Sequence, residues 1–122
     1  MSPEAVSYRH RKLVRDLAKP GTEIAESITP DAAHLLHMAV GVAGEAGELL
    51  DAVKKHVIYN KPLDTENMVE ELGDVEFYMQ GIREFMDITR ETILEHNIVK
   101  LSRRYSEGRY SNQAAQERAD KS

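Results

Sequence analysis

Apolar residues along this chain recur at intervals of three and four positions, and no convincing stretch alternates apolar and polar residues as a β-strand does. The clearest run is an apolar seam between residues 30 and 57. It consists of Leu36, Ala39, Ala43, Ala46, Leu50, Val53 and Val57. We expect this seam to pack against other helices. The pattern predicts an all-α protein, an antiparallel bundle of about four to five helices.

Residues that start or break helices divide the chain into elements. The expected helices cover residues 3–19, 30–57, 65–86 and 88–108. Pro20 and Gly21 should end the first helix, and a polar loop should follow it. We expect helix caps at Thr29, at Asp64 or Thr65, and at Asp87. A single domain should therefore occupy residues 1–108, with its functional core at about 30–105 and a polar, flexible tail at 109–122.

Composition narrows the class of protein. With 122 residues and 41% hydrophobic content, the chain suits one compact domain. A net charge of −5 argues against a binder of polymeric nucleic acid, which needs a basic surface. The chain has no cysteine, which fits a reducing compartment, and no apolar run reaches the roughly 20 residues of a membrane span. We expect a cytoplasmic protein without a membrane partner.

Two short acidic motifs carry the candidate chemistry. Glu45 and Glu48 lie three residues apart in the second expected helix, and Glu71 and Asp74 in the third. A step of three residues puts both carboxylates of a motif on neighbouring positions of one helix face. The second motif shares its face with the apolar residues Val75, Tyr78, Ile82 and Phe85, so its acids should be partly buried. Four converging carboxylates repel one another unless a cation lies among them, which predicts a divalent metal site.

The ligand type selects the ion. Oxygen-only ligands favour Mg²⁺ or Mn²⁺ over zinc and copper. A di-iron centre would need Glu-x-x-His motifs, and histidine follows neither acidic motif at that spacing. His34 and His37 precede the acids and are either substrate contacts or surface histidines. Acids that are exposed or paired with lysines remain the structural alternative to the metal site.

Two further features accompany the acids. Gly41 and Gly44 lie on the side of the second helix that carries the acids, and each costs about 1 kcal/mol relative to alanine. Close approach of another helix or of a ligand would compensate for this. In the fourth helix, Asn97, Lys100 and Arg104 fall within a narrow arc, where the two cations either grip phosphate oxygens or stabilise a helix C-terminus.

These residues carry a resemblance to a known family. The run from Gly44 to Leu49, then Glu70 to Asp74, then Asn97-x-x-Lys100-x-x-x-Arg104-Tyr105 resembles the MazG-like nucleotide pyrophosphohydrolases of the all-α NTP pyrophosphatase superfamily. The resemblance covers about residues 34–105. One departure is visible, because the family often begins its first motif with two adjacent glutamates and this chain has Gly44 at the first of those positions.

The resemblance implies cleavage between the α and β phosphates of a nucleoside triphosphate, giving a monophosphate and pyrophosphate. It implies Mg²⁺ held by Glu45, Glu48, Glu71 and Asp74, with Glu48, or else Glu45, accepting a proton from water. Lys55, Asn97, Lys100 and Arg104 would bind the triphosphate, and Tyr78 or a histidine such as His37 would border the base. Family members commonly work as homodimers or homotetramers, and we expect a homo-oligomer here.

Two other functions remain open at this point. A superfamily cousin would act on dUTP or on a phosphoribosyl-ATP type of pyrophosphate, since the metal motif is shared and the base pocket is not readable. A non-enzymatic helical interaction module would use its acids to bind a basic partner surface. Metal-dependent turnover separates the enzymes from the module, and substrate screening separates the two enzymes.

Overall fold

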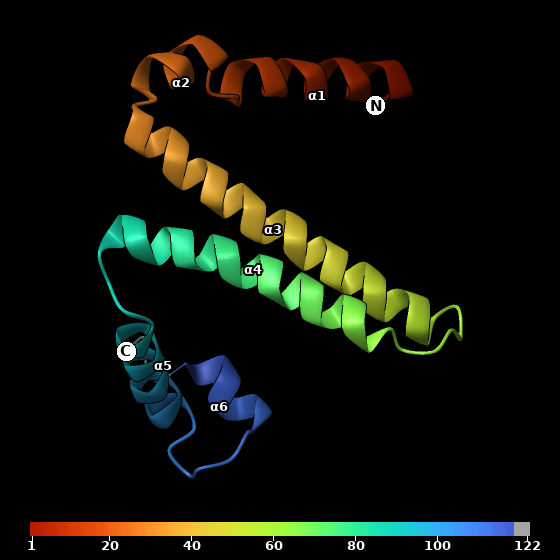
Figure 1. Ribbon diagram of the computed structural model, residues 1–122. Coiled ribbons are helices and arrows are strands. Elements are labelled where there is room, and N and C mark those ends of the chain that lie inside the picture. Colours follow the sequence, from red (N-terminus) through yellow and green to blue (C-terminus); the bar gives the residue numbers. More distant parts are fainter. Residues whose placement is uncertain (119–122) are drawn as a thin grey trace. The chain divides into compact units, whose positions relative to one another are not determined.

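A computed structural model describes residues 1–118, and these residues form helices without any β-strand (Figure 1). The helices are α1 Pro3–Leu17, α2 Gly21–Ser27, α3 Pro30–Val57, α4 Thr65–Met86, α5 Arg90–Arg104 and α6 Asn112–Glu117. The all-α prediction is confirmed, and the long helices lie where the apolar spacing predicted them.

Local capping explains where α3 and α4 begin. The Thr29 hydroxyl accepts a hydrogen bond of 3.1 Å from the backbone N–H of Ala32. The Asp64 carboxylate accepts one of 3.0 Å from the backbone N–H of Asn67. Each bond satisfies an N–H that has no partner inside its helix. Both expected helix starts are therefore confirmed.

The junction between α4 and α5 differs from the expectation. Asp87 does not cap α5; it ends α4 in the left-handed region, with φ of 53°, a conformation that aspartate tolerates better than most residues. Thr89 caps α5 instead, accepting a hydrogen bond of 3.1 Å from the backbone N–H of Thr92. The two residues lie close together in the sequence and both favour helix ends, so the sequence pattern assigned the cap to the wrong one.

Two short helices lie where none was expected. The segment expected to be a polar loop contains α2, which follows Pro20 and carries Glu23 in its first turn. Helix α5 ends at Arg104 rather than near Gly108, and the segment expected to be a polar tail contains α6. Ser111 caps α6 by accepting a hydrogen bond of 3.0 Å from the backbone N–H of Ala114. The remainder of the expected tail, residues 119–122, lies outside the described residues.

The chain divides into two compact units, residues 1–36 and 37–122. In the first unit, α1 starts at Ser2, whose hydroxyl accepts a hydrogen bond from the backbone N–H of Ala5. Helix α1 has no buried residue. In the described part of the chain, no helix is both long enough and apolar enough to cross a membrane.

The second unit contains an antiparallel hairpin made of α4 and the part of α3 from His37 onward, joined by a short loop (Figure 1). Two glycines allow the helices to approach each other closely. The Tyr78 ring of α4 occupies the space where Gly41 of α3 would carry a Cβ atom, and the Met38 side chain of α3 does the same at Gly81 of α4. At Gly41, the close approach of α4 therefore compensates for the free-energy cost of a glycine inside a helix, as expected from the sequence.

The apolar seam of α3 does not pack within the described chain, contrary to the expectation. Its members Leu36, Leu50 and Val57 are exposed, Leu50 with 68% of its surface accessible. Burial falls instead on the neighbouring face, where Met38 and Ala52 are buried and Val42, Glu45 and Leu49 are half-buried. Regularly spaced apolar residues show that one face of a helix is apolar. They do not identify the protein surface that covers this face.

One buried charge lies near the C-terminal end of α4. The side chain of Arg83 is only 6% exposed, and its guanidinium forms an ion pair of 3.2 Å with Glu76. Its Nε–H donates a hydrogen bond of 2.7 Å to the Gln80 side chain. The cation is thus paired and hydrogen-bonded, as a buried charge requires.

Candidate metal centre

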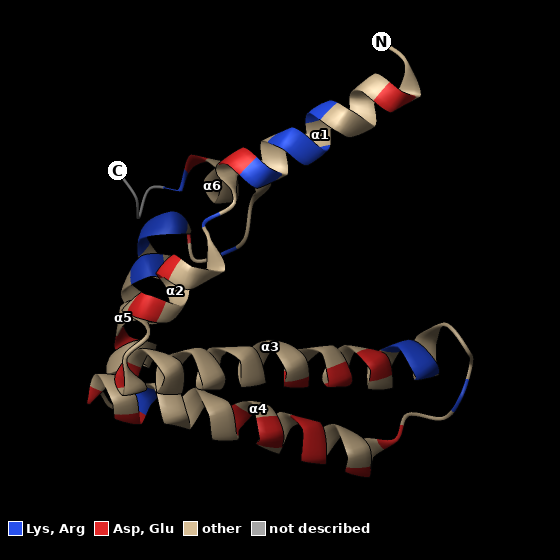
Figure 2. Cartoon of the chain, turned by 90° about the horizontal axis from the view of Figure 1, so that it is seen from above, with Lys and Arg blue, Asp and Glu red and all other residues tan. Residues whose placement is uncertain are grey.

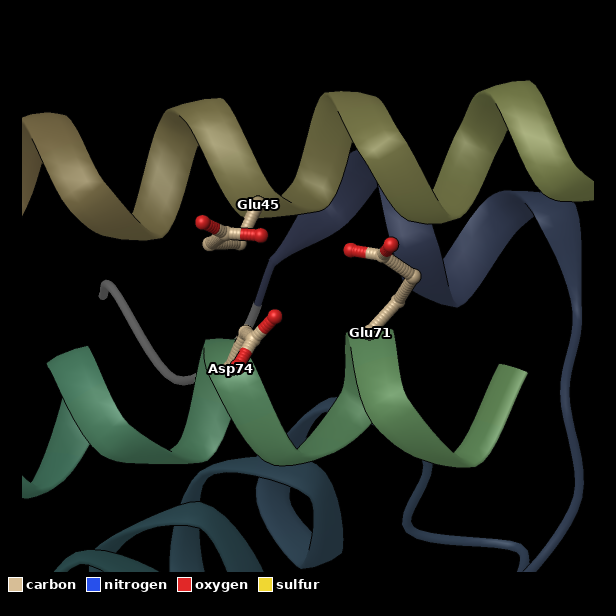
Figure 3. Close-up of side chains that lie close together, drawn as sticks. All are labelled: Glu45, Glu71 and Asp74. Atoms are coloured by element: carbon tan, nitrogen blue, oxygen red, sulfur yellow. The ribbon is translucent and has the colours of Figure 1, made fainter. Parts of the chain in front are cut away.

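Three of the four predicted acids converge between α3 and α4. Glu45 points from α3 toward α4, and Glu71 and Asp74 point from α4 toward α3 (Figure 3). One carboxylate oxygen of each residue lies within 4.8 Å of the others. Glu45 and Glu71 are half-buried and Asp74 is exposed, so the cluster opens to solvent on one side.

The electrostatics of Glu71 reflect this crowding. Burial raises the pKa of its carboxyl group above the ordinary value of 4.5, and the negative charge of Glu45, a hydrogen bond with the Glu45 carboxyl group and the charges of Asp74 and Glu48 raise it further. Its Oε2 atom is buried and has no hydrogen-bond partner among residues 1–118. Buried carboxylate oxygens normally have a partner, so this atom is left for a group outside the chain.

A divalent cation fits these donors. Three carboxylates supply hard oxygen ligands from two directions, and a 2+ charge among them would offset their mutual repulsion. The buried Oε2 of Glu71, which lacks a hydrogen-bond partner within residues 1–118, belongs to one of these three carboxylates. An ion held there would favour the ionised form of Glu71.

Glu48 occupies a different position from the other three acids. Its side chain is exposed and lies outside the group of mutually close oxygens, although its charge acts on Glu71. Lys55 forms an ion pair of 3.1 Å with Asp51. A hydrogen bond from Lys55 to Asp51 and the negative charge of Asp51 raise the pKa of Lys55 above its ordinary value of 10.5. The four-residue spacing of Asp51 and Lys55 could have revealed this pair from the sequence.

Aromatic rings lie one to two helical turns from the acids. The rings of His37 on α3 and Tyr78 on α4 meet edge to face, with centroids 6.1 Å apart. Phe77 meets Tyr78 in the same way at 5.1 Å. The structure thus brings together the two residues expected to border a base, and it adds Phe77, which the sequence motifs did not single out.

The α5 residues are placed on a separate element. Asn97 is exposed, and Lys100 and Arg104 are half-buried. Arg104 lines a cavity of about 320 Å³ together with Arg103, Tyr105 and Arg109. Within residues 1–118, no hydrogen bond or ion pair connects Asn97 or Lys100 to the acid cluster. Their contact with a triphosphate stays a prediction.

The hairpin has an acidic side and an apolar side. At 100° per residue, Glu48 and His37 are turned about 60–80° from Glu45 in one direction, and the apolar seam is turned the opposite way. On α4, Asp74 is turned about 60° from Glu71 in the direction opposite to Leu72. In antiparallel helices, rotations of the same sign lie on the same side of the pair, so acids from both helices share one side. Figure 2 shows several acidic residues of both helices in the half of the hairpin nearer the loop.

Comparison with known proteins identifies the family. The family model of the MazG nucleotide pyrophosphohydrolase domain matches residues 33–108, which include most of α3, all of α4 and α5, and the whole acid cluster. The chain belongs to the MazG family. Its resemblance to MazG-like proteins, first based on the acidic motifs and the α5 residues, is thereby confirmed.

A curated relative of this MazG protein comes from a bacteriophage. The chain is 33% identical over 79 residues to the Gene 37 protein of Mycobacterium phage L5, an alignment that covers 61% of this chain and 68% of the phage protein. No solved structure matches the chain. At the level of the family, the match indicates a nucleotide pyrophosphohydrolase and therefore an enzyme.

Proposed function

We propose that this MazG protein is a metal-dependent nucleoside triphosphate pyrophosphohydrolase. It would cleave NTPs or dNTPs between the α and β phosphates and release a nucleoside monophosphate and pyrophosphate. The observation that carries the proposal is the group of Glu45, Glu71 and Asp74, with mutually close oxygens and an unpartnered buried oxygen on Glu71. The family match supports the same reaction class.

The metal in this proposal is Mg²⁺, with Mn²⁺ as a substitute. Glu45, Glu71 and Asp74 would hold it, and Glu48 would complete the set by a change of side-chain rotamer. The bound ion supplies positive charge that binds phosphate oxygens and offsets the charge that develops during cleavage. The half-buried Glu45 and Glu71 would keep their oxygens fixed relative to the phosphates, because both helices pack around them.

Proton transfer is proposed for Glu48, with Glu45 as the other candidate. Glu48 is exposed beside the cluster, so its carboxylate can accept a proton from a water molecule that attacks the α phosphate. Glu45 is half-buried and close to two other acids, which suits it better to hold the ion.

Substrate contacts are proposed for two regions. Lys55 would reach the outer phosphates from α3 by exchanging its exposed partner Asp51 for phosphate oxygens. Asn97, Lys100 and Arg104 would supply further contacts from α5. His37 and Tyr78 would border the base.

Assembly into a homodimer or homotetramer is also proposed. The apolar seam of α3 is exposed, and so are Val69 and Leu72 on the same side of α4. A second copy that covers this side would remove a large apolar surface from water.

The test is the release of pyrophosphate and monophosphate from a panel of canonical and modified NTPs and dNTPs. Purified wild type is assayed with Mg²⁺, with Mn²⁺ and with EDTA. Release of both products that depends on metal is expected. Absence of turnover on every nucleotide would overturn the proposal, and preference for dUTP would move the protein to the dUTP-cleaving cousins.

A further inference from the structure

The surroundings of Phe77 on α4 are unusual for a large apolar residue. Its surface is 68% accessible, more than that of most apolar residues on α4. Among residues 1–118, its ring meets the Tyr78 ring edge to face, with centroids 5.1 Å apart. Gly73, four residues before it, has no neighbour within 4 Å of the place where a Cβ would lie. The flat face of the Phe77 ring is therefore open to a ligand.

The position of Phe77 relative to the acids argues against a protein interface. Phe77 is turned about 60° from Asp74 around α4, away from the apolar seam side. Its neighbours on this side include Glu70 and Asp74, both exposed. A protein partner that covered Phe77 would also remove these carboxylates from water, which costs several kcal/mol per unpaired ion. A small ligand avoids this cost because it covers the ring and leaves the carboxylates to a metal or to water.

The order of side chains along the hairpin also favours a nucleobase as the ligand of Phe77. Phe77 and Tyr78 lie three and four residues beyond Asp74, about 5–6 Å along the helix axis. Across from them, Gly41 lies one turn from Glu45 and forms the surface against which Tyr78 packs. In the opposite direction the next side chains include Asp51 and Lys55, which are charged and paired. A nucleotide with its phosphates at the acids would thus extend its base toward the rings and its outer phosphates toward Lys55.

We propose that Phe77 is the stacking residue for the nucleobase and that Tyr78, supported by Gly41 and His37, holds Phe77 in place. The inference rests on the proposed function, since a metal ion held by the acids must bind the phosphates for the base to reach Phe77. An aromatic ring stacks on any base, so Phe77 would strengthen nucleotide binding without selecting one base by hydrogen bonds.

The test compares Phe77→Leu with wild type on ATP, on CTP and on ribose 5-triphosphate, which carries the same phosphates without a base. Phe77→Leu should raise KM for both nucleotides about 5- to 100-fold, as expected for one lost stacking contact. KM for ribose 5-triphosphate and kcat for all three compounds should be unchanged. Phe77→Trp should restore the nucleotide KM. Tyr59→Leu, which removes an exposed aromatic ring in the loop between α3 and α4, serves as the matched control and should change nothing.

Two results would overturn the inference. One is an equal KM for Phe77→Leu and wild type on the nucleotides. The other is an equal loss on all three compounds together with a changed mass in sedimentation, which would make Phe77 an interface residue. If wild type hydrolyses none of the compounds, the proposed function fails on its own account. Calorimetric binding of ATP and ribose 5-triphosphate with Mg²⁺ then decides the role of Phe77, because only stacking makes the loss in Phe77→Leu specific to ATP.

Discussion

The Tyr78 ring lies over the backbone of Gly41, in the space that a side chain at Gly41 would occupy. This contact allows α3 and α4 to approach each other beside the acid cluster. Gly41→Ala would force the ring or the helices apart, and we expect it to lower the free energy of unfolding by about 1–3 kcal/mol. Chemical denaturation of purified variants measures the change.

Gly73→Ala is the matched control for this prediction. Gly73 is also in a helix interior, but nothing lies within 4 Å of its would-be Cβ. Alanine there should stabilise the protein by up to about 1 kcal/mol, because it favours the helix more than glycine does. Equal effects of the two substitutions would contradict the packing of Tyr78 on Gly41.

Metal binding should depend on Glu71 and not on its neighbour Glu70. We expect Mg²⁺ at 100 times its Kd to stabilise wild type by about 2.7 kcal/mol, because the ion binds only the folded chain. Glu71→Gln should abolish this gain and reduce turnover at least about 100-fold, since it removes a buried ligand oxygen. Glu70→Gln removes an exposed acid and should keep both properties. Thermal unfolding with and without Mg²⁺ makes the comparison, and equal behaviour of the two variants would refute the site.

Without metal, the dependence of the free energy of unfolding on pH should reveal the raised pKa of Glu71. The pKa of Glu71 in the folded chain lies above its ordinary value of 4.5, mainly because of burial and then because of Glu45. The folded state therefore binds the Glu71 proton more tightly than the unfolded state does, and wild type loses stability as pH rises from about 4.5 through the raised pKa.

Glu71→Gln cannot ionise at this position and escapes the loss. In EDTA, its free energy of unfolding should match that of wild type most closely at low pH and exceed it increasingly toward neutral pH. Denaturation curves from pH 4 to pH 8 provide the test. A difference between the two proteins that does not change with pH would show that Glu71 is not perturbed.

Assembly should depend on the exposed apolar seam. Leu50→Glu places a charge on the seam, and we expect it to shift the sedimentation coefficient toward that of the monomer, because burying a charge opposes association. Leu63→Glu makes the same change at an exposed apolar residue of the loop and should not alter the mass. A wild-type protein that sediments as a monomer would show that a second copy does not cover the seam.

Two ion pairs, Arg83 with Glu76 and Lys12 with Asp16, test whether burial or a short distance between the charged atoms contributes more to stability. Glu76→Gln weakens an ion pair of 3.2 Å whose arginine is buried, and we expect a loss of about 1–2 kcal/mol in unfolding free energy. Asp16→Asn breaks a shorter pair of 2.9 Å with Lys12, in which both side chains are exposed, and should cost at most about 0.5 kcal/mol. The reverse order would mean that Gln80 alone satisfies the buried guanidinium.

The sequence predicted the helices well where the signals are local. Thr29 and Asp64 cap helices as expected, because a cap needs only a side-chain oxygen and a nearby backbone N–H. The motif Glu71-x-x-Asp74 also predicted two carboxylates that lie close together, whereas Glu48 of the first motif lies outside the cluster. Asp87 was misassigned, because residues at both ends of a helix favour similar polar side chains and only the backbone conformation distinguishes them.

Relationships between helices were harder to predict. The pairing of His37 with Tyr78, and the separation of Glu48 from the other three acids, depend on how α3 and α4 align along their length. The spacing of residues within one helix contains no information about that alignment. The seam of α3 was expected to face other helices, yet the described chain leaves it exposed, because periodicity does not specify whether the partner belongs to the same molecule.

The division of the hairpin into an acidic side and an apolar side has an evolutionary consequence. Residues proposed to bind the metal and residues proposed to govern association alternate along the same two helices, but they point in different directions. Mutations can therefore change the number or identity of associated subunits while the reaction chemistry is preserved, and the reverse is equally possible. In a helix pair with this arrangement, the assembly and the choice of substrate can evolve independently of each other.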